Sequence, residues 1–140
     1  METTKNRYLV LVLNISLWIA QILLAIMFFN AGQMKLFHPM EQLAVIMPWS
    51  VDVPVWLVRF IGTCELLGSI GLLLPSILRI KPMLTPIAAF GFALIMLFAA
   101  IFHVSRGEGQ FIGFHIIVMI IAIFIIWGRI KISPIRSKTK

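Results

Sequence analysis

Residues 109–128 read GQFIGFHIIVMIIAIFIIWG, twenty positions without Asp, Glu, Lys or Arg. A helix needs roughly 20 apolar residues to cross the hydrocarbon core of a bilayer, which is about 30 Å thick. Two further charge-free stretches cover 8–34 and 82–105, and a fourth apolar segment lies between Pro54 and Pro75. The sequence therefore predicts an all-α fold, an integral membrane four-helix bundle with helices near residues 8–30, 55–74, 83–104 and 111–128.

The composition excludes a water-soluble globular domain. The chain has 140 residues, of which 61% are hydrophobic and 12% are charged, whereas soluble domains contain about a quarter charged residues. No internal repeat or low-complexity tract divides the chain. We expect a single transmembrane domain over residues 1–140, a multi-pass protein of the cytoplasmic (inner) membrane surrounded by the lipid bilayer.

The formal charge of +7 arises from 12 Lys and Arg against 5 Asp and Glu. Such an excess on a polar protein would indicate nucleic-acid binding, but most of these cations flank the apolar segments, so we expect no nucleic-acid partner. The positive-inside rule assigns the cation-rich side to the cytoplasm. It predicts that both termini are cytoplasmic and that residues 129–140 form a basic cytoplasmic tail. The flanking cations are Lys5, Arg7, Arg79, Lys81, Arg129, Lys131, Arg136, Lys138 and Lys140.

The connection at 31–54 is long for a helical bundle. Its residues 40–47 precede Pro48 and are followed by Trp49, a residue type that is common at the headgroup level. We therefore expect a short interfacial helix in the 31–54 connection.

Three cations, Lys35, Arg59 and Arg106, are left over, and all fall in the outer half of the predicted bundle. A charged side chain costs about 2.5–3.5 kcal/mol at the centre of a membrane helix, so each charged residue at depth is a candidate functional residue. We predict one polar pocket in this outer half. Its main candidates are Lys35, Glu65, His103, Arg59 and Gln21, and its secondary candidates are His38, His115 and Glu108.

Helical phase indicates which of these residues meet. Residues three or four apart share a helix face, so Lys35 shares the face of Gln21 if the first helix continues beyond its predicted end. Arg59 lies six residues before Glu65, about 240° around the helix axis. We expect Glu65 to pair with Lys35 or His103. Arg59 is expected at the membrane interface instead.

The inner half and the short outer loop contain fewer polar residues. Asn14 is the one strongly polar residue predicted within the inner half, and we expect it to be a packing residue. Arg106 and Glu108 are expected to form a solvated pair in the loop.

The sequence contains no pattern that identifies a catalytic or metal site. Cys64 is the only cysteine, which excludes a membrane dithiol oxidoreductase with a CxxC pair. His103 and His115 could ligate haem iron from adjacent helices, but two histidines are weak evidence and we expect no haem. His38, Glu41 and His103 lack a diagnostic metal-ligand spacing. We therefore assign no catalytic residues, no metal ligands and no evident cofactor.

Three short motifs follow one another along the chain. AG-x-x-KL occupies 31–36, FIG-x-x-ELLG occupies 60–68, and residues 96–108 combine M-x-x-AA-x-x-H with RGE. Together, over about residues 20–128, these motifs resemble the DoxX-like family of small four-helix membrane proteins. The resemblance implies that Lys35, Glu65 and His103 are hallmark polar positions. The family takes its name from a subunit of a thiosulfate:quinone oxidoreductase, so a quinone is one candidate ligand.

The leading hypothesis is an accessory or redox-associated subunit that binds a small molecule or a partner helix in the outer-half polar pocket. Its partner would be a membrane oxidoreductase complex, and we expect no catalysis by the isolated chain. The alternative is a membrane chaperone or assembly factor that holds client membrane proteins. A small proton-coupled exporter is less favoured, because small multidrug-resistance proteins carry the essential Glu in the first helix, where this chain has Gln21. Helix faces rich in small residues would also permit a homodimer.

Overall fold

The structure is a computed structural model that describes residues 2–138. Within that range every regular element is helical, and four of the helices are long and apolar enough to cross a membrane, which confirms the predicted all-α membrane fold. The long helices are α1 (Glu2–Phe37), α3 (Val55–Leu78), α4 (Leu84–Ser105) and α5 (Ile112–Trp127), and α2 (Met40–Ile46) is short. Single turns of 3₁₀ helix at Pro48–Val51 and Gly109–Phe111 and a π-helical turn at Gly128–Ile132 complete the fold.

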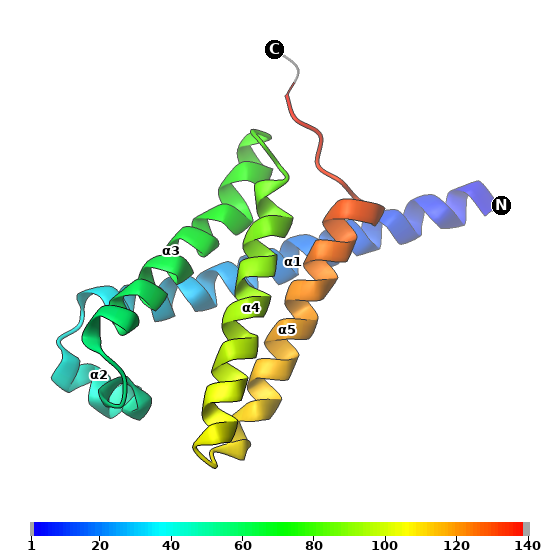
Figure 1. The fold of residues 1–140 in the computed structure, drawn as a ribbon. Helices are drawn as coiled ribbons and strands as arrows, with labels where there is room; N and C mark the ends of the chain where they lie inside the picture. Colours follow the sequence, from blue (N-terminus) through cyan, green and yellow to red (C-terminus); the bar gives the residue numbers. More distant parts are fainter. Residues whose placement is uncertain (1, 139–140) are drawn as a thin grey trace.

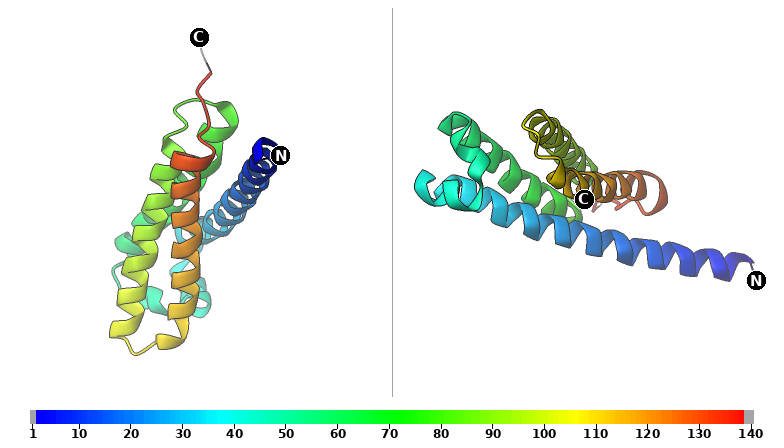
Figure 2. Two further views of the ribbon diagram at one scale, coloured as in Figure 1. Left: turned by 90° about the vertical axis from the view of Figure 1, so that its right-hand side faces the viewer. Right: turned by 90° about the horizontal axis from the view of Figure 1, so that it is seen from below.

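The helices α4 and α5 lie side by side and antiparallel, joined by a tight connection (Figure 1). The helix α3 packs beside α4, and α1 runs obliquely across the other long helices. Its most extensive contact is with α3, and its middle reaches α5. The first turns of α1 project beyond the rest of the bundle (Figure 2).

Two helices extend further than the sequence predicted. The helix α1 ends at Phe37 rather than near residue 30, so Lys35 lies in its last turn. The helix α3 continues through Pro75 to Leu78. Proline lacks the N–H that would bond the carbonyl four residues earlier, and the hydroxyl of Thr85 on α4 lies 3.3 Å from that carbonyl, of Gly71. The neighbouring helix thus supplies the missing donor.

The short helix expected in the 31–54 connection is present as α2. Pro39 precedes it in an extended conformation, with ψ of 145°, and cannot continue α1. Leu43 is fully buried and fixes α2 against the bundle. Its position relative to the membrane interface stays a prediction.

The two ends of the bundle differ in charge. The backbone N–H of Lys138 donates to the carbonyl of Arg79 at 3.0 Å, and the Ser133 hydroxyl donates to Asn14 on α1 at 3.1 Å. The tail, the α3–α4 turn and the first half of α1 therefore share one end, here called the basic end. The opposite end, with α2 and the α4–α5 connection, is called the histidine end. That the basic end faces the cytoplasm stays a prediction of the positive-inside rule.

Aromatic stacking and glycine contacts hold the middle of the bundle together. Phe28 of α1 and Phe92 of α4 stack with ring centroids 3.8 Å apart and planes 8° from parallel. At Gly68 of α3, a Cβ atom would lie 2.6 Å from the Phe92 ring. Membrane helices associate through close van der Waals packing of this kind, because lipid is as apolar as the helix surface.

Candidate functional site

A buried ion pair joins α1 to α3 near the histidine end. Lys35 Nζ lies 2.9 and 2.8 Å from the two carboxylate oxygens of Glu65, and the two side chains are only 7% and 4% exposed. Trp49 covers the ammonium group, with its ring centroid 6.0 Å from Nζ. The predicted pairing of Glu65 with Lys35 is therefore correct, and both oxygens of the carboxylate are engaged.

Two glycines allow the helices to come close enough for this ion pair. A Cβ atom at Gly32 would lie 2.7 Å from the carbonyl oxygen of Gly62, and one at Gly62 would lie 2.8 Å from Cβ of Lys35. Contacts this short do not occur between real Cβ atoms and backbone. The α1–α3 crossing thus depends on the absence of side chains at both positions.

Arg59 bonds the C-terminal end of α1, and its position relative to the membrane interface stays a prediction. Its Nη2 donates to the carbonyl of His38 at 2.9 Å, and its Nη1 donates to the carbonyl of Lys35. The last carbonyls of a helix lack intrahelical partners, and a cation near them also interacts favourably with the helix dipole. Arg59 therefore caps the C-terminus of α1. It makes no bond to Glu65, as expected from its phase.

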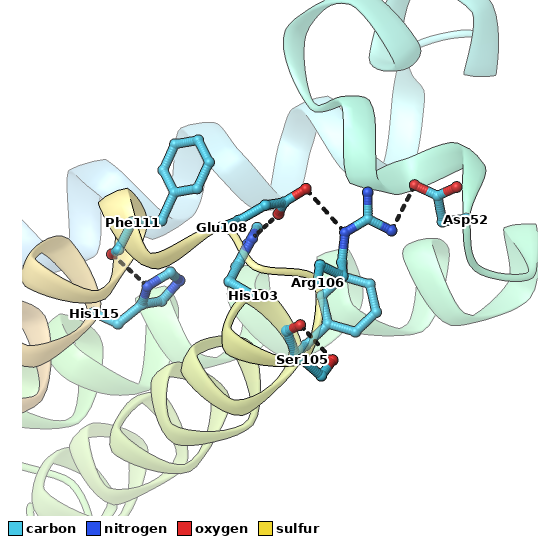
Figure 3. Close-up of polar contacts among 8 residues, drawn as sticks. Asp52, His103, Ser105, Arg106, Glu108, Phe111 and His115 are labelled. Carbon is cyan, nitrogen blue, oxygen red and sulfur yellow. Dashed lines mark hydrogen bonds and ion pairs between the residues drawn. The ribbon is translucent and has the colours of Figure 1, made fainter.

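His103 lies in a separate cluster at the end of α4 (Figure 3). Its Nδ1 is 2.6 Å from Glu108, which also accepts from Arg106 Nε at 3.0 Å. Arg106 in turn donates to Asp52 at 2.8 Å and so ties the loop after the Pro48–Val51 turn to α4. The predicted Arg106–Glu108 pair is present, but it belongs to a larger network that also contains His103 and Asp52.

His115 of α5 faces His103 across the α4–α5 connection. The His115 residue is 5% exposed, and its Nδ1 is 2.7 Å from the carbonyl of Phe111, which can only accept. The two imidazole centroids are 5.2 Å apart, and the ring of Phe111 lies 5.1 Å from that of His103. These two rings and those of Phe102 and Phe111 form an aromatic cluster at the histidine end.

The hydrogen bond from His103 Nδ1, followed by the bond from Arg106, holds the pKa of Glu108 below its ordinary value. A carboxylate with a lowered pKa stabilises the fold above its ordinary pKa, about 4.3 for Glu, and this contribution disappears as the pH falls through the lowered value. We expect the unfolding midpoint of Glu108→Gln to fall less than that of the wild type between about pH 5 and 3. Thermal unfolding followed by circular dichroism would measure the unfolding midpoint of each protein at each pH. Glu41→Gln, which alters an exposed carboxylate of α2, is the control and should behave as the wild type; equal pH profiles for Glu108→Gln and the wild type would contradict the prediction.

Gln21 does not belong to the outer polar pocket that the sequence predicted. Its Nε2 donates to the carbonyl of Leu72 at 2.8 Å, and its Oε1 accepts from Nε of Arg129. Arg129 Nη1 donates to Asn14 Oδ1 at 2.8 Å. Gln21 is fully buried and Arg129 is 4% exposed. Gln21 and Lys35 lie on the same long helix but at different depths. At the depth of Gln21, α1 meets Arg129 near the basic end.

The structure does not place Arg129 in the tail predicted at 129–140. This residue lies inside the π-helical turn at Gly128–Ile132, so the non-helical tail begins only after Ile132. Gly128 has no side chain, and Leu17 of α1 packs into the space thus left. The spacing of Asn14 and Gln21, seven residues apart on one face, was a signal that a buried polar partner would approach α1 from another helix.

The long apolar helices, their buried Lys35–Glu65 ion pair and their polar clusters at both ends define a small multi-pass membrane protein. Residues 19–125 match the DoxX-like family, and this match includes Lys35, Glu65 and His103. The match covers most of the chain, so the protein belongs to the DoxX-like family. No curated protein and no solved structure matches the chain.

Proposed function

We propose that this protein is an accessory, redox-associated membrane subunit that binds a quinone or quinol at the cluster of His103, His115, Phe102 and Phe111. We call this proposed site the histidine pocket. One observation carries the proposal: two imidazoles lie 5.2 Å apart, and each is fixed through Nδ1, His103 by Glu108 and His115 by a backbone carbonyl. When Nδ1 donates, Nε2 of a neutral imidazole is a hydrogen-bond acceptor. Each ring therefore has one nitrogen available for a ligand.

The chemistry of the pocket fits a quinol headgroup. A quinol hydroxyl donates to an imidazole Nε2, and a protonated His103 donates back to a quinone carbonyl. The rings of Phe102, 5.7 Å from His103, and Phe111 supply aromatic faces for a flat ligand. The electrons would pass to a partner oxidoreductase.

The Lys35–Glu65 pair has a structural role in this proposal. Both Glu65 oxygens are bonded to Lys35, which leaves the carboxylate committed to its partner helix. The same geometry argues against the exporter hypothesis, in which this carboxylate would have to exchange a proton for a cationic substrate.

Tryptophan fluorescence can test quinone binding, because the Trp49 ring lies 6.4 Å from that of Phe102. We expect decylubiquinone to quench Trp49 in purified protein whose other three tryptophans are replaced by Phe. In this background His115→Ala should raise the Kd about ten-fold, the effect of losing about 1.4 kcal/mol from one hydrogen bond.

His38→Ala is the matched control. The His38 backbone carbonyl accepts the hydrogen bond from Arg59, so the loss of the ring leaves this bond in place. The Kd of this variant should equal that of the parent. Equal affinities of the His115 and His38 variants, or no saturable quenching in the parent protein, would refute quinone binding at this pocket. Recovery of a client membrane protein without quinone in mild detergent would favour the assembly-factor alternative.

A further inference from the structure

An open hollow of about 450 Å³ lies at the basic end, between the first half of α1 and the segment after the π-helical turn. Its polar wall includes the exposed Arg7 and the half-buried Asn14 and Ser133. Val10 and Leu11 form its apolar wall. Asn14 Oδ1 accepts bonds from both Arg129 and Ser133, so the amide N–H groups of Asn14 remain as donors.

Arg129 is a buried cation that contacts Asn14 and Ser133, two residues that line the hollow. It is 4% exposed, its Nη2 has no hydrogen-bond partner, and no carboxylate pairs with it among the side chains that the structure describes. Its guanidinium donates to Gln21, to Asn14 and to the carbonyl of Ser133. It also lies 5.0 Å from the ring of Trp18. Burying a cation without a counter-charge is costly.

None of the residues that line the hollow is acidic. Four of the 5 acidic residues of the chain lie at or near the histidine end of the bundle; they are Glu41, Asp52, Glu65 and Glu108. Lys5, Arg79, Lys81, Lys131, Arg136 and Lys138 belong to the basic end. An anion in the hollow would therefore meet the guanidinium of Arg7 and the amide donors of Asn14, with no carboxylate among the residues that line the hollow.

We propose that this hollow binds the phosphate of an anionic membrane phospholipid. Arg7 would pair with the phosphate, for which a guanidinium is well suited. The amide N–H groups of Asn14 donate to the phosphate, and the Ser133 hydroxyl holds that amide in place through its bond to Oδ1. Arg129 stabilises the negative charge from behind them. Val10 and Leu11 lie beside the glycerol and the first methylene groups of the lipid. Basic pockets between membrane helices commonly bind such headgroups.

Native mass spectrometry of the full chain can test this proposal. The protein is delipidated, then exchanged into mixed micelles that contain phosphatidylglycerol and phosphatidylcholine in equal amounts. We expect the wild type to retain one phosphatidylglycerol molecule in preference to phosphatidylcholine. Arg7→Gln should lower this retention about ten-fold, as expected for the loss of a charge-assisted hydrogen bond, and Ser133→Ala should lower it less.

Arg136→Gln is the matched control, because it removes an equal charge from the exposed tail at the same end. Its retention should stay at the wild-type level. These variants avoid Arg129, whose loss would also remove the buried bonds to Gln21 and Asn14. Equal retention by Arg7→Gln and Arg136→Gln, or no preference for the anionic lipid, would overturn the proposal. Displacement of the lipid by millimolar inorganic phosphate would assign the site to a soluble anion instead of a lipid.

Discussion

Replacing Glu65 by Leu, or Lys35 by Met, will destabilise the protein by about 3–5 kcal/mol, the cost of leaving one partner of a buried ion pair uncompensated. The pair is almost completely enclosed, with side-chain exposures of 7% and 4%, so water cannot solvate the charge that remains. The double variant Lys35→Met with Glu65→Leu should recover most of the loss, because apolar residues of similar volume can replace a buried ion pair.

Unfolding in mixed micelles of increasing SDS content, followed by circular dichroism, would measure these differences. Thr63→Ala is a suitable control on the same helix, since its exposed hydroxyl bonds only the carbonyl of Arg59 within α3. If the double variant is as unstable as the sum of the two single variants, the two charges do not stabilise each other. The ion pair would then not be the contact that holds α1 against α3 near the histidine end.

The second large effect is expected at the α1–α3 crossing. Gly32→Ala will place a Cβ atom 2.7 Å from a backbone carbonyl oxygen of Gly62 and 3.0 Å from Cβ of Glu65. Neither neighbour is the flexible end of a side chain, so the helices must separate. Overpacking of this kind costs about 1–3 kcal/mol, and the separation also stretches the ion pair of Lys35 with Glu65.

Gly91→Ala is the matched control, because a Cβ atom at Gly91 would meet nothing within 4 Å. Alanine is the better helix former by about 1 kcal/mol, so this variant should equal or exceed the wild type in stability. The same SDS titration compares the two alanine variants. Equal stabilities of Gly32→Ala and Gly91→Ala would mean that the crossing tolerates a wider helix spacing than the structure shows.

The number and the approximate places of the membrane helices could be predicted from hydropathy, because a span needs a fixed apolar length. The helix ends could not. Pro75 marks a helix end by local rules, but Thr85 on another helix satisfies the carbonyl that proline leaves free. The end of α1 depends likewise on Arg59, which bonds its last carbonyls from α3. Such interhelical contacts have no local signal in the sequence.

The contacts of the polar residues could likewise be predicted only in part. Helical phase left Lys35 and His103 as possible partners of Glu65. The structure pairs Glu65 with Lys35, where glycines let the two helices approach closely. Helical phase could not show that the residues predicted for one pocket lie at different depths, because phase does not specify the depth of a residue along a long tilted helix. Gln21 therefore joined Arg129 at the basic end, and His103 joined Glu108 in the network near the connection of α4 and α5.

The length of α1 has a consequence for its tilt in the membrane. Its charge-free run at 8–34 is about 40 Å long at 1.5 Å per residue, against a hydrocarbon core of about 30 Å. A freely tilting helix would adjust this mismatch by changing its angle. Here the angle is fixed at two separate points, by Glu65 near one end and by Arg129 at Asn14. In bilayers of different thickness, α1 can therefore change its tilt only together with the rest of the bundle, unless one of these buried contacts breaks.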